Sequence, residues 1–264
     1  MLGAIIGDVV GSPYETYSDK SKDFRFFDGA CRATDDSIMT IAVGCACVDS
    51  DIDDEEMFKS CLVERMRELG RQYPDAGYGR MFYDWLMSDT KGAYGSRSNG
   101  SAMRVSPVAW AADSLEQAET LAKWSAEVTH SHPEGIRGAQ AVAAAVYMAR
   151  NGSDKDEIRE YIEEKYYNLD FTVDEIRPGY SFDVSCEGSV PQAIVCFLES
   201  ENFEDAVRNA VSLGGDADTQ GCIAGAIAEA FYGIPDDIQE EVFDYVDETL
   251  QDYYWGYSEE LYNR

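Results

Sequence analysis

The stretch ATDDSIMTIAVGCACV, residues 33–48, decides the fold class of this chain. Its segment 37–48 is small and apolar, and it is long enough to form a buried helix. The same pattern returns at 219–232, where TQGCIAGAIAEAFY again follows a short acidic cluster. Because both runs carry almost no charge, we expect two interior helices, each with acidic residues at its N-terminal end.

Helical periodicity continues through most of the remaining chain. It predicts further helices at 55–71, 77–87, 115–128, 134–150, 155–165, 190–198, 203–212 and 238–250. The Ala-rich helix 134–150 is expected to be central, and the charged helix 155–165 is expected on the surface. Strand signals are confined to 24–27 and 171–176, which could form short extended pieces, and no βαβ alternation occurs. The sequence predicts an all-α, compact orthogonal multi-helix fold, with a single domain spanning 1–264.

The charge balance excludes several classes of partner. The chain has 264 residues, with 21 Lys and Arg against 51 Asp and Glu, which gives a formal net charge of −30. Such a surface repels a phosphate backbone, so we expect no nucleic-acid partner and no membrane partner. No window reaches the roughly 18 to 20 apolar residues that a membrane span needs. The N-terminus lacks the basic region of a secretory signal.

The cysteines indicate a reducing compartment. There are seven of them, an odd number, and no Cys-x-x-Cys pair occurs. Buried reduced thiols explain this usage, so a cytoplasmic location is expected. The sequence does not settle the oligomeric state, and a monomer is the default expectation.

Two acidic clusters lie directly before the two apolar helices. They are Thr34-Asp35-Asp36 and Asp216-Ala217-Asp218-Thr219. Thr34 and Asp216 stand where N-terminal caps are expected, but a cap needs only one such residue. Four carboxylates buried together are costly unless cations neutralise them. Carboxylate and hydroxyl oxygens suit Mg²⁺, Mn²⁺ or Ca²⁺, so both helix capping and a metal site remain open.

The N-terminal segment combines a packing pattern with a candidate acid or base. Gly3, Gly7 and Gly11 recur every four residues, a spacing that makes a smooth stripe on a helix. Glu15 follows Pro13 at the expected helix end. Its carboxylate could act as a general acid or base, and an ordinary surface glutamate is the alternative.

Two further segments could contact a ligand. Residues 95–104, GSRSNGSAMR, offer small side chains and backbone N–H groups that can cradle phosphates, although a flexible surface loop is the alternative. Both histidines lie in THSHP at 129–133, where a His-x-His pair can bind metal or phosphate. There is no G-x-S-x-G motif, and no cysteine has a histidine nearby in sequence, so nucleophilic Ser or Cys catalysis has no support.

Six motifs in a fixed order resemble the ADP-ribosylglycohydrolase family. They are GAIIGDVVGSPYE (3–15), ATDDSIMTIAV (33–43), YPDAGYG (73–79), SNGSAMRVSPV (98–108), THSHPEGIRGAQAVA (129–143) and LGGDADTQGCIAGAIAEAFYG (213–233). TDDS near the start together with GGDADT near the end is the most specific combination. The resemblance implies an all-α fold with a binuclear metal site at the base of a cleft, holding two Mg²⁺ ions or, in some members, Mn²⁺.

The resemblance also implies roles for individual residues. By motif match, the metal ligands would be Thr34, Asp35, Asp36, Asp216, Asp218 and Thr219. The catalytic residues would be Glu15, Asp35 and Asp218, with Glu15 as the acid or base. The substrate-binding residues would be Gly79, Gly95, Ser96, Arg97, Asn99, Gly100, Ser101 and His130. The implied partner is an ADP-ribosylated protein or small molecule.

The implied reaction is metal-dependent hydrolysis of the N- or O-glycosidic bond between ADP-ribose and an acceptor, with release of ADP-ribose. The bond would break through an oxocarbenium-like state, as in glycoside hydrolysis. Because ADP-ribose is an anion, the site needs local positive potential, which we expect from the metals, the helix N-termini and Arg97. The acceptor stays open, as does the role of residues 179–188, which border the cleft in bacterial relatives.

Two other functions are compatible with parts of the pattern. One is a non-catalytic ADP-ribose-binding module, which the intact Glu15 and the two intact acidic clusters argue against. The other is a two-metal hydrolase of nucleotides or phosphoesters, which the acidic clusters alone would permit. An assay of the products formed from nucleotide substrates separates this second function from de-ADP-ribosylation.

Overall fold

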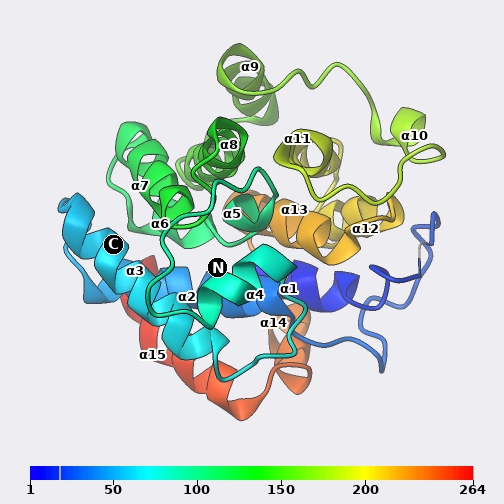
Figure 1. Ribbon diagram of the computed structural model, residues 1–264. Coiled ribbons are helices and arrows are strands. Elements are labelled where there is room, and N and C mark those ends of the chain that lie inside the picture. The colour runs from blue at the N-terminus through cyan, green and yellow to red at the C-terminus, as the bar shows by residue number, and fades with distance from the viewer. Residues whose placement is uncertain (18, 264) are drawn as a thin grey trace.

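The two apolar runs form helices α2 (Asp35–Asp49) and α13 (Ala217–Tyr232) in the computed structural model, which describes residues 1–17 and 19–263. Both helices are buried along most of their length, as their lack of charge predicts. Helix α1 (Leu2–Gly11) lies beside α13 in the middle of the molecule (Figure 1). The acidic starts of α2 and α13 therefore lie in the interior.

The other elements surround this central group. They are α3 (Glu55–Gly70), α4 (Arg80–Leu86), α5 (Gly100–Met103), α6 (Ser106–Ala111), α7 (Leu115–Glu127), α8 (Pro133–Arg150), α9 (Lys155–Lys165), α10 (Val173–Ile176), α11 (Cys186–Leu198), α12 (Phe203–Ser212), α14 (Asp236–Glu241), the 3-10 turn η1 (Val242–Asp244) and α15 (Glu248–Tyr262). Helices α8 and α11 pack on one side of the pair α1 and α13, and α2, α3 and α15 lie on the other side of that pair (Figure 1). Within the described residues no strand forms, which confirms the all-α class.

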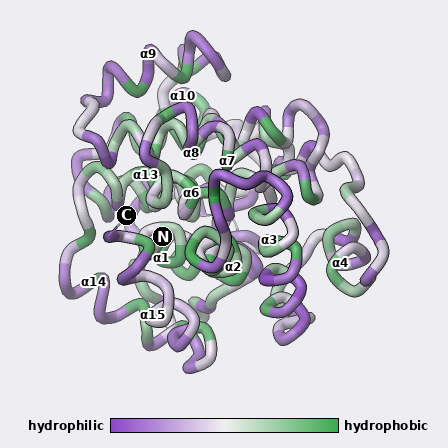
Figure 2. Tube along the Cα trace, turned by 90° about the vertical axis from the view of Figure 1, so that its left-hand side faces the viewer, coloured by the Kyte–Doolittle hydropathy of each residue, from purple (hydrophilic) through white to green (hydrophobic). Residues whose placement is uncertain are grey.

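The hydropathy of each helix matches its place. The Ala-rich α8 is buried along most of its length and packs against several helices, as expected for a central element. Helix α9 is charged and lies at the edge, where it stands out in purple in Figure 2. A capping box between Asp154 and Glu157 starts α9 at the predicted residue. None of the helices in the described part of the chain is both long and apolar enough to cross a bilayer.

The two expected extended pieces are not strands. At 171–176 the chain instead forms α10, because Thr172 and Glu175 make a capping box that starts a helical turn. At 24–27 the backbone is irregular, and the Arg208 guanidinium donates to the carbonyl of Phe24 at 2.6 Å. A side chain thus satisfies a carbonyl that a neighbouring strand would otherwise bind.

The prediction of one helix at 238–250 is also wrong. Helix α14 ends at Glu241, and a new helix begins after Asp247, whose carboxylate accepts hydrogen bonds from the backbone N–H groups of Thr249 and Leu250. This cap starts α15, which the sequence did not predict. Helix α11 begins at Cys186, four residues before the predicted start, because the Ser185 hydroxyl caps it by accepting from the Gly188 N–H.

The glycine stripe of α1 brings two helix backbones into direct contact. A Cβ atom built on Gly3 would lie 2.3 Å from the carbonyl oxygen of Gly225, and one built on Gly7 would lie 1.9 Å from that of Gly221. At Gly11 the corresponding distance to the Ala217 carbonyl is 2.5 Å. The helices run in opposite directions, so the C-terminal end of α1 meets the N-terminal end of α13. This contact confirms the packing prediction and brings the segment containing Glu15 to the acidic start of α13.

Candidate active site

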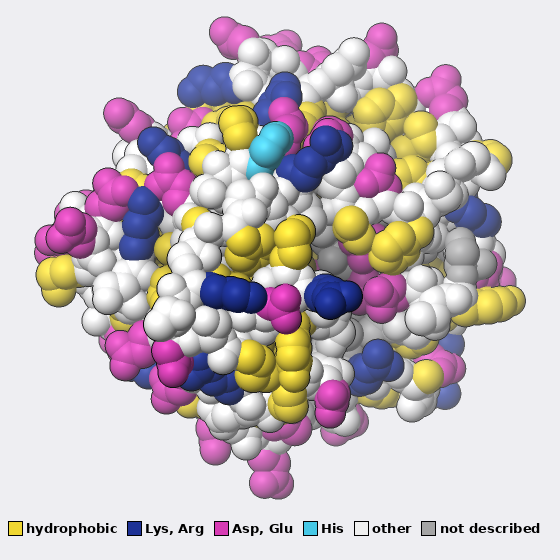
Figure 3. Space-filling model, viewed as in Figure 1, with side chains coloured by type: hydrophobic (Ala, Val, Ile, Leu, Met, Phe, Trp, Pro, Cys, Tyr) yellow, Lys and Arg dark blue, Asp and Glu magenta, His cyan; other side chains and the backbone are white. Residues whose placement is uncertain are grey.

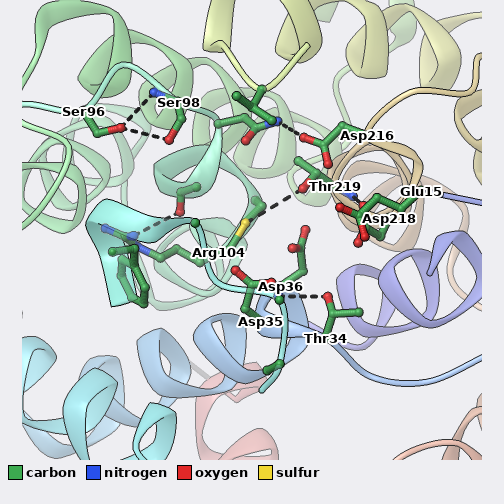
Figure 4. Close-up of a pocket in the computed structure, with 18 of the residues that line it drawn as sticks. Glu15, Thr34, Asp35, Asp36, Ser96, Ser98, Arg104, Asp216, Asp218 and Thr219 are labelled. Carbon is green, nitrogen blue, oxygen red and sulfur yellow. Dashed lines mark hydrogen bonds between the residues drawn. The ribbon is translucent and has the colours of Figure 1, made fainter. Parts of the chain in front are cut away.

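A cavity of about 400 Å³ opens where α1, α2 and α13 meet. That volume suits a small-molecule ligand. Figure 4 shows Thr34, Asp35 and Asp36 facing Asp216, Asp218, Thr219 and Glu15 across its base. Of the residues predicted from sequence, its lining contains Glu15, Thr34, Asp35, Asp36, Gly79, Ser96, Asn99, Gly100, His130, Asp216, Asp218 and Thr219.

A glycine turn sets the direction of Asp216. Gly214 and Gly215 have φ angles of +69° and +79°, a left-handed conformation that side chains other than glycine rarely adopt. Asp216 occupies the N-cap position of α13, as predicted, but its side chain makes no capping bond to the described residues. Its Oδ2 instead accepts from the Asn99 amide at 2.6 Å, which holds the carboxylate at the cavity. The Thr34 hydroxyl does cap α2, by accepting from the Asp36 N–H.

Asp8 is a site residue that the sequence analysis missed. Its fully buried carboxylate accepts from the N–H and hydroxyl of Thr34 at 2.9 and 2.6 Å. It also accepts from the N–H of Ser37 at 3.0 Å and from the Ser37 hydroxyl. Oδ2 accepts three of these hydrogen bonds and Oδ1 accepts one, so Asp8 fixes the start of α2 and keeps a free acceptor position on Oδ1. In the sequence, Asp8 could have been identified as the single carboxylate within the apolar stretch GAIIGDVVG.

The remaining carboxylates form an arrangement that a cation would stabilise. Asp36 and Asp218 group with Asp8, while Glu15 and Asp216 form a second group that shares Asp218; within each group the ligand atoms lie within 4.8 Å. Asp36 Oδ1 is buried and has no hydrogen-bond partner among the described residues. An orphaned carboxylate oxygen among other carboxylates costs several kcal/mol unless positive charge is added. The donor set therefore fits hard divalent ions such as Mg²⁺.

The pKa shifts of these groups have the same cause. Burial, followed by the negative charge of neighbouring carboxylates, raises the pKa of Asp36 and of Asp218 well above the ordinary value. Burial and Asp8 raise the pKa of Asp35 to about 8, and burial raises that of Asp216 to about 6. Without a bound cation, these groups hold protons in the folded state that they lose in the unfolded state.

We therefore expect Mg²⁺ to stabilise the protein more strongly as pH rises. Between about pH 4 and pH 8, the folded metal-free protein binds more protons than the unfolded chain, so its stability falls with rising pH. Mg²⁺ needs the deprotonated carboxylates and competes with those protons. Saturating Mg²⁺ should raise the Tm by about 5 °C or more at pH 8 and by less than about 2 °C at pH 5.5. Thermal melts with NaCl at matched ionic strength are the control, and an equal shift at both pH values would contradict the expectation.

Three of the predicted substrate residues do not line the cavity. The Arg97 guanidinium is exposed and pairs with Glu187, so its charge is already matched. The buried Ser101 hydroxyl donates to the Gly135 carbonyl at 2.7 Å. Gly95 has a φ of +67° and shapes the loop. The cavity lining instead includes Arg32 and Arg80, which make no ion pair within the described part of the chain.

Residues 179–188 form one rim of the cavity. The N–H of Asn99 donates to the Val184 carbonyl at 2.8 Å, and the N–H of Cys186 donates to the Arg97 carbonyl at 3.1 Å. These bonds attach the rim to the loop at 95–100, and Phe182 and Val184 contribute exposed apolar side chains to the lining. Basic and hydrophobic side chains lie together across the middle of this face in Figure 3, while acidic side chains dominate its margins.

The family follows from a comparison over the whole chain. Residues 1–264 match the family model described as ADP-ribosylglycohydrolase. This chain belongs to the ADP-ribosylglycohydrolase family. Its members are hydrolytic enzymes, so the prediction of an ADP-ribosyl glycohydrolase is confirmed.

Individual ADP-ribosylglycohydrolase relatives are distant but cover most of the chain. The human ADP-ribosylhydrolase ARH3 is 28% identical, over 98% of this chain and 89% of its own. The ADP-ribosylarginine hydrolase Tri1 of Pseudomonas putida is 27% identical, over 89% of this chain and 70% of its own. A solved structure described as an ADP-ribosylglycohydrolase-related protein complex aligns with a TM-score of 0.68 at 21% identity, covering 99% of this chain and 96% of that one. The last comparison supports the fold alone.

Proposed function

We propose that this ADP-ribosylglycohydrolase is metal-dependent and binds two Mg²⁺ ions at the base of the cavity, with Mn²⁺ able to substitute. The observation that supports this most is the position of Asp218, which belongs to both groups of three carboxylates. A carboxylate shared in this way can bridge two ions. Asp35, Asp36 and Thr34 would complete one side, and Asp216 and Thr219 the other, as the family resemblance implies.

Residues of this chain would carry out the proton transfer and hold the reacting groups in position. When bound, Mg²⁺ would supply a Lewis acid that polarises the ribose hydroxyls and orients a water. Glu15 is half-buried at the cavity and would take the proton from that water as it attacks C1″ of the ribose. The acceptor leaves as the C1″ bond breaks, and ADP-ribose is released. Asn99 holds Asp216, and Asp8 holds Thr34, so these groups need no reorganisation during the reaction.

The test of this function is release of free ADP-ribose from arginine-linked, serine-linked and O-acetyl substrates. Each is assayed with Mg²⁺ and with a chelator, and the Asp35→Ala/Asp218→Ala protein serves as the blank. The arginine linkage comes first, because it appears in the name of the Tri1 relative. We expect Mg²⁺-dependent release from one linkage. Binding of ADP-ribose without release from any linkage would favour a binding module, and absence of both would overturn the proposal.

Replacing Glu15 by Gln separates two roles for this residue. If Glu15 is the acid or base, turnover should fall by about 10² or more, because proton transfer to a positioned side chain is lost. ADP-ribose affinity and Mg²⁺ affinity, both measured by calorimetry, should then stay unchanged. A fall in Mg²⁺ affinity together with turnover would make Glu15 a metal ligand. Unchanged turnover would remove it from both roles.

The cysteines support a reducing compartment such as the cytoplasm. All seven lie in the described part of the chain, and none of them forms a disulfide there. Six of them are buried, where oxidants have little access.

A further inference from the structure

A hydrogen-bonded series of side chains leads from the core to the cavity wall. It starts at Arg104, whose side chain is fully buried and makes no ion pair with any described residue. The guanidinium donates to the carbonyls of Gly100 and Ser125 at 3.0 and 2.8 Å, and to the hydroxyl of Thr129 at 2.8 Å. A buried cation without a carboxylate partner can only donate, so it sets the direction of every bond that follows.

The first consequence concerns the protonation of His130. Because Thr129 Oγ1 accepts from Arg104, its own proton needs an acceptor, and its other partner is His130 Nδ1 at 2.8 Å. If Nδ1 carried the ring proton, Thr129 Oγ1 would accept twice and its own buried proton would have no acceptor among the described residues, so these contacts favour a bare Nδ1. Burial, together with the charge of Arg104, lowers the pKa of His130 well below its ordinary value, so the ring is neutral and its proton sits on Nε2.

The same direction continues to the loop that lines the cavity. With Nδ1 bare, His130 Nε2–H donates to Ser98 Oγ at 3.0 Å. One of the Ser96 and Ser98 hydroxyls donates to the other, and their Oγ atoms lie 2.9 Å apart. Ser96 Oγ also accepts from the Ser98 N–H at 3.1 Å (Figure 4). A hydroxyl has two acceptor positions and one proton. Whichever hydroxyl donates within this pair, the other accepts two hydrogen bonds and has only its own proton left to donate. Both side chains line the cavity.

We propose that Arg104, Thr129 and His130 are positioning residues that leave the Ser96–Ser98 pair of hydroxyls with one proton to donate to the ligand. The series selects an acceptor oxygen, and the nearby buried positive charge favours an anionic one such as a phosphoryl oxygen. The identity of that ligand as ADP-ribose rests on the proposed function. The direction of the hydrogen bonds does not, because it follows from contacts within the protein.

The test reads the histidine tautomer directly. Long-range ¹H–¹⁵N correlation spectra of the full chain at neutral pH report which ring nitrogen carries the proton. The chain has only two histidines, so His132→Asn assigns the His130 signals, and Asn keeps a side chain suited to the helix cap that His132 provides. We expect His130 to be the Nε2–H tautomer. A proton on Nδ1, or a charged ring, would overturn the proposal, whether or not the protein binds ADP-ribose.

The matched variants are Thr129→Val and Thr129→Ser. Valine removes the donor to Nδ1 while Arg104 keeps its bond to the Ser125 carbonyl, and serine restores the hydroxyl. In Thr129→Val the Nε2–H preference should be lost and ADP-ribose affinity, measured by calorimetry with Mg²⁺, should fall about tenfold; Thr129→Ser should restore both. An Nε2–H tautomer that survives in a folded Thr129→Val protein would overturn the role of Thr129. If the wild type shows the Nε2–H tautomer but binds no ADP-ribose, the proposed function fails while the hydrogen-bond direction stands.

Discussion

Replacing Asp218 by Asn is expected to reduce turnover by about 10³-fold or more. Asp218 is the carboxylate common to both groups at the base of the cavity, so the change would affect both of the proposed ion positions. A metal acting as a Lewis acid contributes several kcal/mol to transition-state stabilisation, which corresponds to this factor. The amide oxygen of asparagine can still accept the Thr219 N–H that Asp218 Oδ1 accepts at 2.9 Å, so the local fold should persist. Release of ADP-ribose from the best substrate is the measurement.

Metal-free stability distinguishes this effect from misfolding. Removal of one buried carboxylate from the cluster should raise the Tm of the metal-free protein at pH 8, and Mg²⁺ should no longer raise it further. Asp156→Asn, an exposed carboxylate at the start of α9, is the matched control and should change neither quantity. Calorimetric titration should find two Mg²⁺ ions in the wild type and one in Asp216→Asn. Full activity in Asp218→Asn would remove this residue from the metal site.

Replacing Gly7 by Ala is expected to destabilise the fold by about 3 kcal/mol or more. The new Cβ would lie 1.9 Å from the Gly221 carbonyl oxygen and 2.2 Å from its carbon. Both atoms belong to the backbone of α13, so relief requires the two helices to move apart. For a domain of this size the Tm should fall by about 6–12 °C in thermal melts. Because α1 and α13 bring Glu15 and Asp218 together, stabilisation by Mg²⁺ should weaken as well.

The control for Gly7 is the same substitution in another helix. Gly256 lies within α15, and apart from its chain neighbours and the adjacent backbone of its own helix, no atom of the described residues is within 4 Å of a Cβ built there. Gly256→Ala should stabilise the protein by about 0.5–1 kcal/mol, because alanine loses less backbone entropy in a helix. If Gly7→Ala lowers the stability of the fold and Gly256→Ala raises it, the loss at Gly7 is due to backbone contact between α1 and α13. A Gly7→Ala protein as stable as the wild type would contradict the close approach of the helices.

Secondary structure was predictable where one local signal dominated. The uncharged runs after Thr34 and Asp216 predicted two buried helices, and the charged helical period of 155–165 predicted α9 with the bounds observed. Predictions failed where two signals competed. The helix expected at 238–250 breaks because Asp247 caps a new helix, and α10 replaces an extended piece because Thr172 caps it. Short polar caps outweigh hydrophobic periodicity in such segments.

The sequence by itself determined the all-α class and half of the residues that line the cavity. Helix formation and helix ends depend on neighbours a few residues apart, and the motifs carry the site residues with them. Only the tertiary structure decided what those residues do to one another. Asn99 holds a carboxylate 117 positions away, Asp8 fixes a helix 26 positions away, and Arg97 is matched by Glu187. Hydrogen bonds and ion pairs require particular distances and angles between their partners. For partners far apart in the sequence, helix packing sets these distances and angles, and their spacing along the chain does not predict them.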